Sequence, residues 1–179
     1  MTKYSLTLRL IHWVMALILL SLLGIGFWMT DLPGDYPDKY SVIYPMHKSF
    51  GLLAFAFVLL RISARLTSTI PNYEEYKIKK LEILSAKVVH GCFYLCMLVI
   101  PLSGYFMSTF GGHPVAFFGL RLPAMKLADP ALQSQLAAIA RDVHGLGGVI
   151  LVTLVALHLL GTLKHVILDK QAIFSRMWF

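Results

Sequence analysis

Four long apolar segments constrain this chain more than any other feature of its sequence. They cover residues 10–29, 44–66, 88–110 and 143–163. Each is long enough for a helix that crosses a bilayer, which needs roughly 20 apolar residues. Polar and apolar residues do not alternate with the period of two that a membrane β-barrel requires. The pattern predicts an all-α integral membrane protein, a four-helix bundle that forms one transmembrane domain over residues 1–179.

The composition agrees with this prediction. Hydrophobic residues make up 58% of the chain and charged residues 14%, whereas average soluble domains have about 45–50% and about 25%. A soluble fold and a disordered chain are therefore excluded, and two cysteines are too few for a disulfide scaffold. No signal-peptidase site follows the first apolar segment, so we expect it to be retained as a span.

Basic residues are distributed unevenly between the two sides that four spans define. Eleven of the sixteen lysines and arginines fall on the side that holds both termini and residues 61–87. The other side has five, namely Lys39, Lys48, Arg121, Lys126 and Arg141. By the positive-inside rule, both termini face the cytoplasm. The acidic residues are nearly balanced, with Glu74, Glu75, Glu82 and Asp169 inside, so the whole net charge of +7 lies on the cytoplasmic side. The charge therefore reports topology, and we expect membrane lipid rather than nucleic acid as a partner.

Histidines inside the spans are the candidate functional residues, because ionisable groups are costly in a membrane. His144 and His158 are fourteen residues apart on the last span, which places them about 21 Å apart with about 40° of rotation between them. Two sites at two depths are therefore predicted, each needing a partner from another helix. His47 is the candidate at the outer level, and His12 and His90 compete at the inner level.

Two imidazoles that face each other across a bundle suit the axial ligation of haem iron. Zinc would need about four ligands at one depth, and Cys92 and Cys96, four residues apart, do not form a CxxC site. Glycines near these histidines leave room for a flat porphyrin or serve ordinary helix packing. They are Gly24, Gly26, Gly51, Gly145, Gly147, Gly148 and Gly161.

Haem propionates need cations near the membrane surface. Arg61, Arg65 and Lys164 are the candidates on the inner side, and Lys48 is the candidate on the outer side. Positive-inside topology explains most of these residues equally well. The third connection also carries a predicted amphipathic helix over residues 130–142, with Asp129 as its N-cap and Pro130 at its first position. We expect this helix to lie at the membrane surface and to run into the fourth span.

Seven stretches of this sequence are similar to the bacterial cytochrome b561 family, the four-span type that includes the superoxide oxidases. They are LRLIHW around His12, YPMHKSFG (44–51), LLRISARL (59–66), KVVHGCFYL (87–95), IPLSGYFM (100–107), VAFFGLRLP (115–123) and VHGLGGVILVTLVALH (143–158). The resemblance implies two b-type haems, with His12 and His158 on the cytoplasmic one and His47 and His144 on the outer one. It leaves His90 unligated, with a structural role or with a role at a quinone. It also implies a location in the bacterial inner membrane.

The resemblance implies an oxidoreductase that passes electrons from an outer donor, superoxide, to ubiquinone or another membrane quinone. The CxxCH motif is absent, so we expect noncovalent haem. Lys48 and Arg121, with Lys126 and Arg141, are candidates for steering the superoxide anion. The leading alternative is an electron-transfer subunit that relays electrons between quinol and a separate protein partner. A membrane protein without haem and a zinc protein are further alternatives, and the absence of HExxH argues against the zinc protein.

Overall fold

The computed structural model describes residues 2–71, 78–123 and 125–179. Glu74, Glu75 and Lys77, which entered the topology prediction, lie outside the described residues. Four helices account for most of the chain: α1 (Leu6–Asp31), α2 (Tyr44–Thr67), α3 (Lys80–Phe110) and α4 (Pro130–Leu163). Each is long and apolar enough to cross a membrane, which confirms the predicted all-α membrane bundle.

The helices begin where the sequence offers a cap. The Ser5 side chain accepts a hydrogen bond from the Leu8 amide at the start of α1. Asp129 accepts from the amides of Ala131 and Leu132, and Pro130 takes the first position of α4, as predicted. The predicted helix over residues 130–142 does run into the fourth span, because α4 continues without interruption for 34 residues, and it therefore does not form a separate surface helix. At 1.5 Å per residue α4 is about 51 Å long and projects beyond a hydrocarbon core of about 30 Å.

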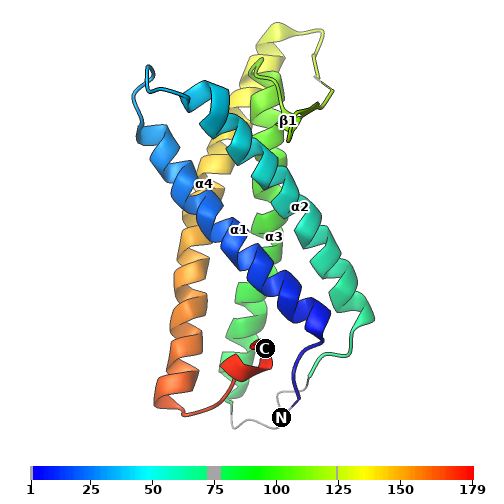
Figure 1. Ribbon diagram of the computed structural model, residues 1–179, viewed down its shortest axis with the longest axis vertical. Helices are drawn as coiled ribbons and strands as arrows, with labels where there is room; N and C mark the ends of the chain where they lie inside the picture. Colours follow the sequence, from blue (N-terminus) through cyan, green and yellow to red (C-terminus); the bar gives the residue numbers. More distant parts are fainter. Residues whose placement is uncertain (1, 72–77, 124) are drawn as a thin grey trace.

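Short elements complete the chain. They are the π-helices η1 (Lys39–Ile43) and η2 (Lys164–Leu168), the 3₁₀-helix η3 (Phe174–Arg176), and the strands β1 (Ala116–Phe117) and β2 (Leu120–Arg121). Both termini lie at one end of the bundle (Figure 1), which we call the terminal end. The hairpin of β1 and β2 lies at the other end, which we call the loop end.

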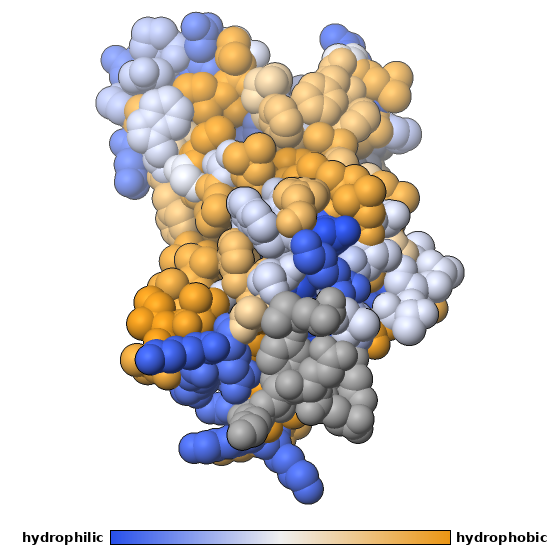
Figure 2. All heavy atoms as spheres, turned by 60° about the horizontal axis from the view of Figure 1, so that its bottom comes forward, coloured by the Kyte–Doolittle hydropathy of each residue, from blue (hydrophilic) through white to orange (hydrophobic). Residues whose placement is uncertain are grey.

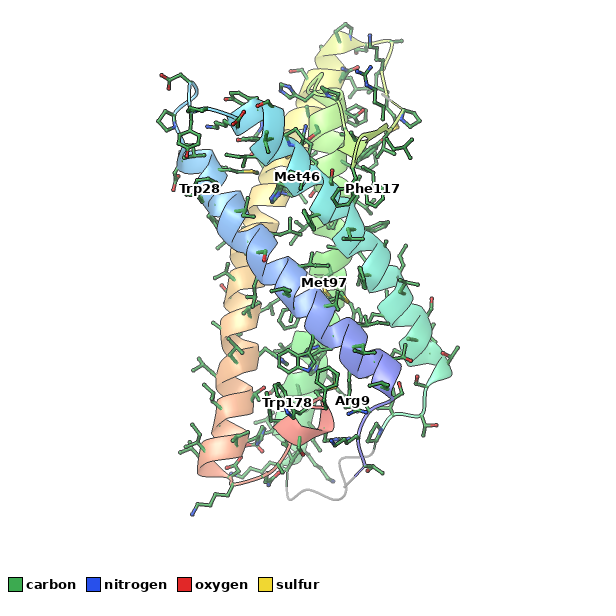
Figure 3. All side chains as sticks on the ribbon, viewed as in Figure 1. Arg9, Trp28, Met46, Met97, Phe117 and Trp178 are labelled. Atoms are coloured by element: carbon green, nitrogen blue, oxygen red, sulfur yellow. The ribbon has the colours of Figure 1, made fainter. Side chains whose placement is uncertain are left out.

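The helices pack in sequence order, with close backbone contacts between α1 and α2, between α2 and α3, and most extensively between α3 and α4. The backbones of α1 and α4, and of α2 and α4, make almost no close contacts. A small core of Met15, Val58 and Met97 joins α1, α2 and α3 near the middle of the bundle (Figure 3). The functional site bridges these two helix pairs, α1 with α4 and α2 with α4.

Apolar side chains cover the outside of the bundle. Within the most apolar window of each span only 6–11% of residues are buried, so most of these side chains face outward. Figure 2 shows hydrophobic residues between hydrophilic groups at both ends of the visible face. Such a surface is stable in lipid and aggregates in water.

The hairpin is fastened to α2 through one buried hydroxyl. Its turn has positive φ at Phe118 and Gly119, as a type I′ turn requires. Ser49 Oγ accepts a hydrogen bond of 3.1 Å from the Phe118 amide and lies 3.1 Å from the Ala116 carbonyl oxygen. Phe50 packs edge-on against Phe118 at a centroid distance of 5.3 Å. Ser49 therefore positions residues 115–122 over the loop end of α2.

We expect Ser49→Ala to release this hairpin without unfolding the bundle. The Phe118 amide would lose its partner, which costs about 1–3 kcal/mol where water does not replace it. Hydrogen exchange of residues 115–122 should become faster. Ser63→Ala is the matched control, because Ser63 bonds only to the Leu59 carbonyl of its own helix. Equal exchange in the two variants would contradict the assigned role of Ser49.

Candidate functional site

Two histidines face each other at the loop end of the bundle. His47 on α2 and His144 on α4 have ring centroids 6.3 Å apart and ring planes at 79°. The backbones of these two helices make almost no close contact, so the two imidazoles meet between helices that do not pack directly on each other. The predicted outer pair is therefore brought together.

His144 is oriented by α3. Its Nδ1 lies 2.9 Å from the Ile100 carbonyl oxygen, and because a carbonyl only accepts, Nδ1 carries the proton in this arrangement. The Ser103 hydroxyl donates to the same carbonyl at 2.8 Å. This leaves Nε2 as the free nitrogen of His144. A metal-bound histidine in proteins usually has its other nitrogen held in this way.

Glycines stand directly against both loop-end rings. A Cβ at Gly26 would lie 3.2 Å from His47 Cε1, and a Cβ at Gly104 would lie 2.9 Å from His144 Cε1. Gly26 was among the predicted glycines, whereas the sequence analysis did not connect Gly104 with this site. One feature of the sequence could have indicated this role: Gly104 lies at the same depth in its span as His144 does in its own. A Cβ at Gly24, Gly51, Gly145 or Gly161 would meet nothing within 4 Å. Gly147 packs against Ile100, and Gly148 faces Phe27.

Three histidines meet towards the terminal end. His12 on α1 and His158 on α4 have centroids 6.3 Å apart with planes at 63°. His90 on α3 is also near, 5.5 Å from His158 with planes at 75°. Phe93 also packs edge-on against His158 at 5.7 Å. Both inner candidates that the sequence left open are thus near His158.

The geometry of the two pairs fits a haem held by two imidazoles. With metal–nitrogen bonds of about 2 Å, two rings on opposite sides of one metal have centroids about 6 Å apart. The His12–His158 and His47–His144 pairs both have a spacing of 6.3 Å. His47 Nδ1 is buried without a hydrogen-bond partner among the described residues. Paired imidazoles of this kind suit b-type ligation.

Comparison with known proteins agrees with this geometry. A family model described as prokaryotic cytochrome b561 matches residues 3–179. The chain belongs to the prokaryotic cytochrome b561 family. It is similar to cytochrome b561 homolog 2 of Escherichia coli (strain K12), with 29% identity over 98% of this chain and 90% of that protein. It is also similar to cytochrome b561 homolog 1 of the same organism, with 21% identity over 99% of this chain and 97% of that protein.

Membership in the cytochrome b561 family has direct consequences. The chain is a b-type membrane cytochrome that binds haem and transfers electrons. The four long helices of the chain are the spans of this fold. Because the match begins at residue 3 and ends at residue 179, both histidine pairs and the C-terminal segment lie within the family region.

One basic residue that the sequence assigned to a cytochrome b561 propionate site is engaged elsewhere. Lys164 donates to Glu82 at 2.6 Å and to Asp169 at 2.8 Å, so its charge is already balanced by two carboxylates. The Lys164 ammonium lowers the pKa of Asp169, and His165 Nδ1, 2.7 Å from the same oxygen, acts in the same direction. Lys164 therefore ties α4 to α3 at the terminal end and is a poor candidate for a propionate.

The two arginines of α2 remain at the terminal end. Arg61 is half-buried and donates to the Leu8 carbonyl of α1 at 3.2 Å. That bond uses one of its five donors and places the guanidinium near His12 and His158. Arg65 lies one turn further on and is exposed.

The candidates for anion steering gather around the hairpin. Lys48 donates to the Pro114 carbonyl at 3.2 Å, and Arg121 pairs with Ala116 across the hairpin. Arg121, Lys126 and Arg141 are exposed. His113, also exposed, lies just before the hairpin. Lys48 on α2 and Arg121 on the hairpin therefore both lie at the end of the bundle that holds the His47–His144 pair.

Proposed function

We propose that this chain is a dihaem cytochrome that carries electrons across the bacterial inner membrane, with both termini in the cytoplasm. The observation that carries the proposal is the repetition of one ligand geometry at two depths. Two histidine pairs with the same centroid spacing share α4, and their α4 members are about 21 Å apart along the helix. Each bound haem supplies one-electron chemistry at its iron.

His47 and His144 would hold the haem nearer the loop end, and His12 and His158 would hold the other, each through one ring nitrogen. The Ile100 carbonyl fixes His144 for this task. The core of Met15, Val58 and Met97 excludes water from the middle of the bundle. Arg61 and Arg65 would pair with the propionates nearest the terminal end. No covalent attachment is expected, because the CxxCH motif is absent.

The electron donor that we propose is superoxide, arriving at the loop end. Lys48 and Arg121 would attract the anion towards the His47–His144 pair. Two superoxide anions each lose one electron and leave as dioxygen. A membrane quinone such as ubiquinone takes up the two electrons and two protons and becomes a quinol. His90, beside His158, would hydrogen-bond the quinone.

An electron-transfer subunit with a separate protein partner is the second candidate. The first turns of α4 extend beyond the expected bilayer and expose Leu132 and Ile139. A largely apolar groove of about 390 Å³ runs between α3 and α4 and includes Phe106, Phe110, Leu136 and Ile139. Exposed apolar surface outside the lipid favours contact with another protein. In this case electrons would pass between quinol and that partner.

Rapid mixing separates the two functions. Superoxide added to the oxidised protein should reduce the haem, and quinone should then reoxidise it. Replacing both Lys48 and Arg121 by Gln should slow the reduction about ten-fold, because electrostatic steering raises association rates by that order or more. Lys87→Gln, at the other end of the bundle, is the control and should leave the rate unchanged. If superoxide does not reduce the haem, the second function stands in place of the first.

A further inference from the structure

Residues 174–179 lie against residues 3–13. From this contact we infer that residues 174–179 hold Trp13 against His12 and so make Trp13 a positioning residue for the imidazole that binds the haem nearer the terminal end. The inference rests on the proposed ligand role of His12. The contact itself joins parts of the chain that are more than 160 residues apart.

Four consecutive carbonyls at the C-terminus accept hydrogen bonds from the N-terminal segment. Arg176 accepts from the Tyr4 amide at 3.2 Å. Met177 accepts from Trp13 Nε1 at 2.9 Å, and Trp178 accepts from Arg9 at 2.9 Å. Phe179 accepts from Lys3 at 3.1 Å. A run of bonded carbonyls indicates a docked segment rather than a loose end, because each bond fixes the backbone at one residue.

Aromatic rings link this docked segment to His12. Trp13 packs edge-on against His12, with centroids 5.3 Å apart and planes at 74°. On its other side Trp13 packs edge-on against Trp178 at 5.5 Å and Phe174 at 6.0 Å. Phe174 and Trp178 stack on each other at 5.3 Å. Figure 3 shows Trp178 and Arg9 close to each other at the terminal end of the bundle. The indole of Trp13 is therefore held by the hydrogen bond of its N–H and by its ring contacts with Phe174 and Trp178.

A buried arginine anchors the segment. Arg176 is only 2% exposed, and its guanidinium donates to the Pro71 carbonyl at 2.6 Å. The same guanidinium lies over the Tyr4 ring, 5.4 Å from its centroid. Both contacts join the C-terminal segment to the chain on either side of the α1–α2 hairpin. The bond to Pro71 and the ring of Tyr4 offset part of the cost of burying this charge.

Helix packing explains why His12 needs such support. The backbones of α1 and α4 make almost no close contact, so packing between these helices does not fix the distance from His12 to His158. The C-terminal segment follows α4 in the chain and ends on α1, and it therefore ties the two ligand-bearing helices together. Groups that orient a metal ligand typically change metal affinity about 10–100-fold when removed.

Two variants of the full membrane protein test this inference. One ends at Ile173, and the other is Trp13→Phe, which keeps a ring but loses the N–H donated to Met177. Redox titration and low-temperature electron paramagnetic resonance distinguish the two haems, and His158→Ala identifies which signals belong to the one nearer the terminal end. We expect that haem alone to change in both variants. Its midpoint potential should fall, since water admitted at His12 stabilises the charged ferric form, and its affinity should drop about 10-fold in the truncated chain.

Trp28→Phe is the matched control, because Trp28 lies on the same helix at the loop end and packs on Tyr36. It should leave both signals unchanged. Wild-type signals for both haems in the truncated chain and in Trp13→Phe would overturn the inference. Equal changes in both haems would also overturn it, since they would report general loosening. If the wild-type protein itself gives no signals from haem with two imidazole ligands, the proposed function fails, and this inference fails with it.

Discussion

His158→Ala should leave the protein with about half of its haem, because we propose this residue as the α4 ligand of one of two haems. The expected result is loss of one set of redox and spectral signals, with the other set unchanged. His144→Ala should remove the complementary set. Pyridine haemochrome analysis gives the amount of haem per chain, and optical redox titration shows which signals remain. His113→Ala, in the exposed loop, should retain both haems.

The same measurement distinguishes His12 from His90, the two residues beside His158. His12→Ala should lose the haem that His158→Ala loses, whereas His90→Ala should retain it with modified properties. The closer spacing of His90 and His158, 5.5 Å, does not favour ligation, since two rings on one metal are about 6 Å apart. Haem loss in His90→Ala together with full haem in His12→Ala would show that the assigned ligand set is wrong.

Gly104→Ala should remove the other haem by adding a single methyl group. Its Cβ would lie 2.9 Å from His144 Cε1 and 3.0 Å from His144 Nδ1. The imidazole would have to move away from the Ile100 carbonyl that orients it. Affinity for this haem should fall at least about 10-fold, the typical cost of losing such a partner.

The matched control is Gly91→Ala on the same helix, where an added Cβ would meet nothing within 4 Å. Both substitutions favour the helical backbone by about 1 kcal/mol, so a loss of haem in Gly104→Ala alone reports the contact with His144. Haem affinity should be compared by titrating the haem-free proteins with haem, which separates weak binding from poor supply. Wild-type haem affinity in Gly104→Ala would contradict the proposed orientation of His144.

Features that depend on position along one helix were predictable from the sequence. The four spans, the Asp129 cap and the two depths of His144 and His158 follow from local composition and from a rise of about 1.5 Å per residue. The face that each helix turns to its neighbours is not fixed in this way. For that reason the sequence left His12 and His90 open as partners of His158, and the model brings both of them near it.

Contacts between distant segments were not predictable from a single sequence. Lys164 was expected near a propionate because of its depth, yet it pairs with Glu82 of α3 and with Asp169. The role of Gly104 required knowledge of how α3 is rotated against α4. The docking of residues 174–179 on α1 depends on the path of the chain after α4, where the sequence has no regular pattern.

The order in which the helices pack also bears on how the protein is made. The close neighbours α1–α2 and α3–α4 are consecutive hairpins, and each can form in the membrane as soon as its second helix is inserted. Each proposed haem takes one histidine from the first hairpin and one from the second. Neither half of the chain therefore holds a complete ligand set, and cofactor capture is a late event in biogenesis that locks two preformed halves together.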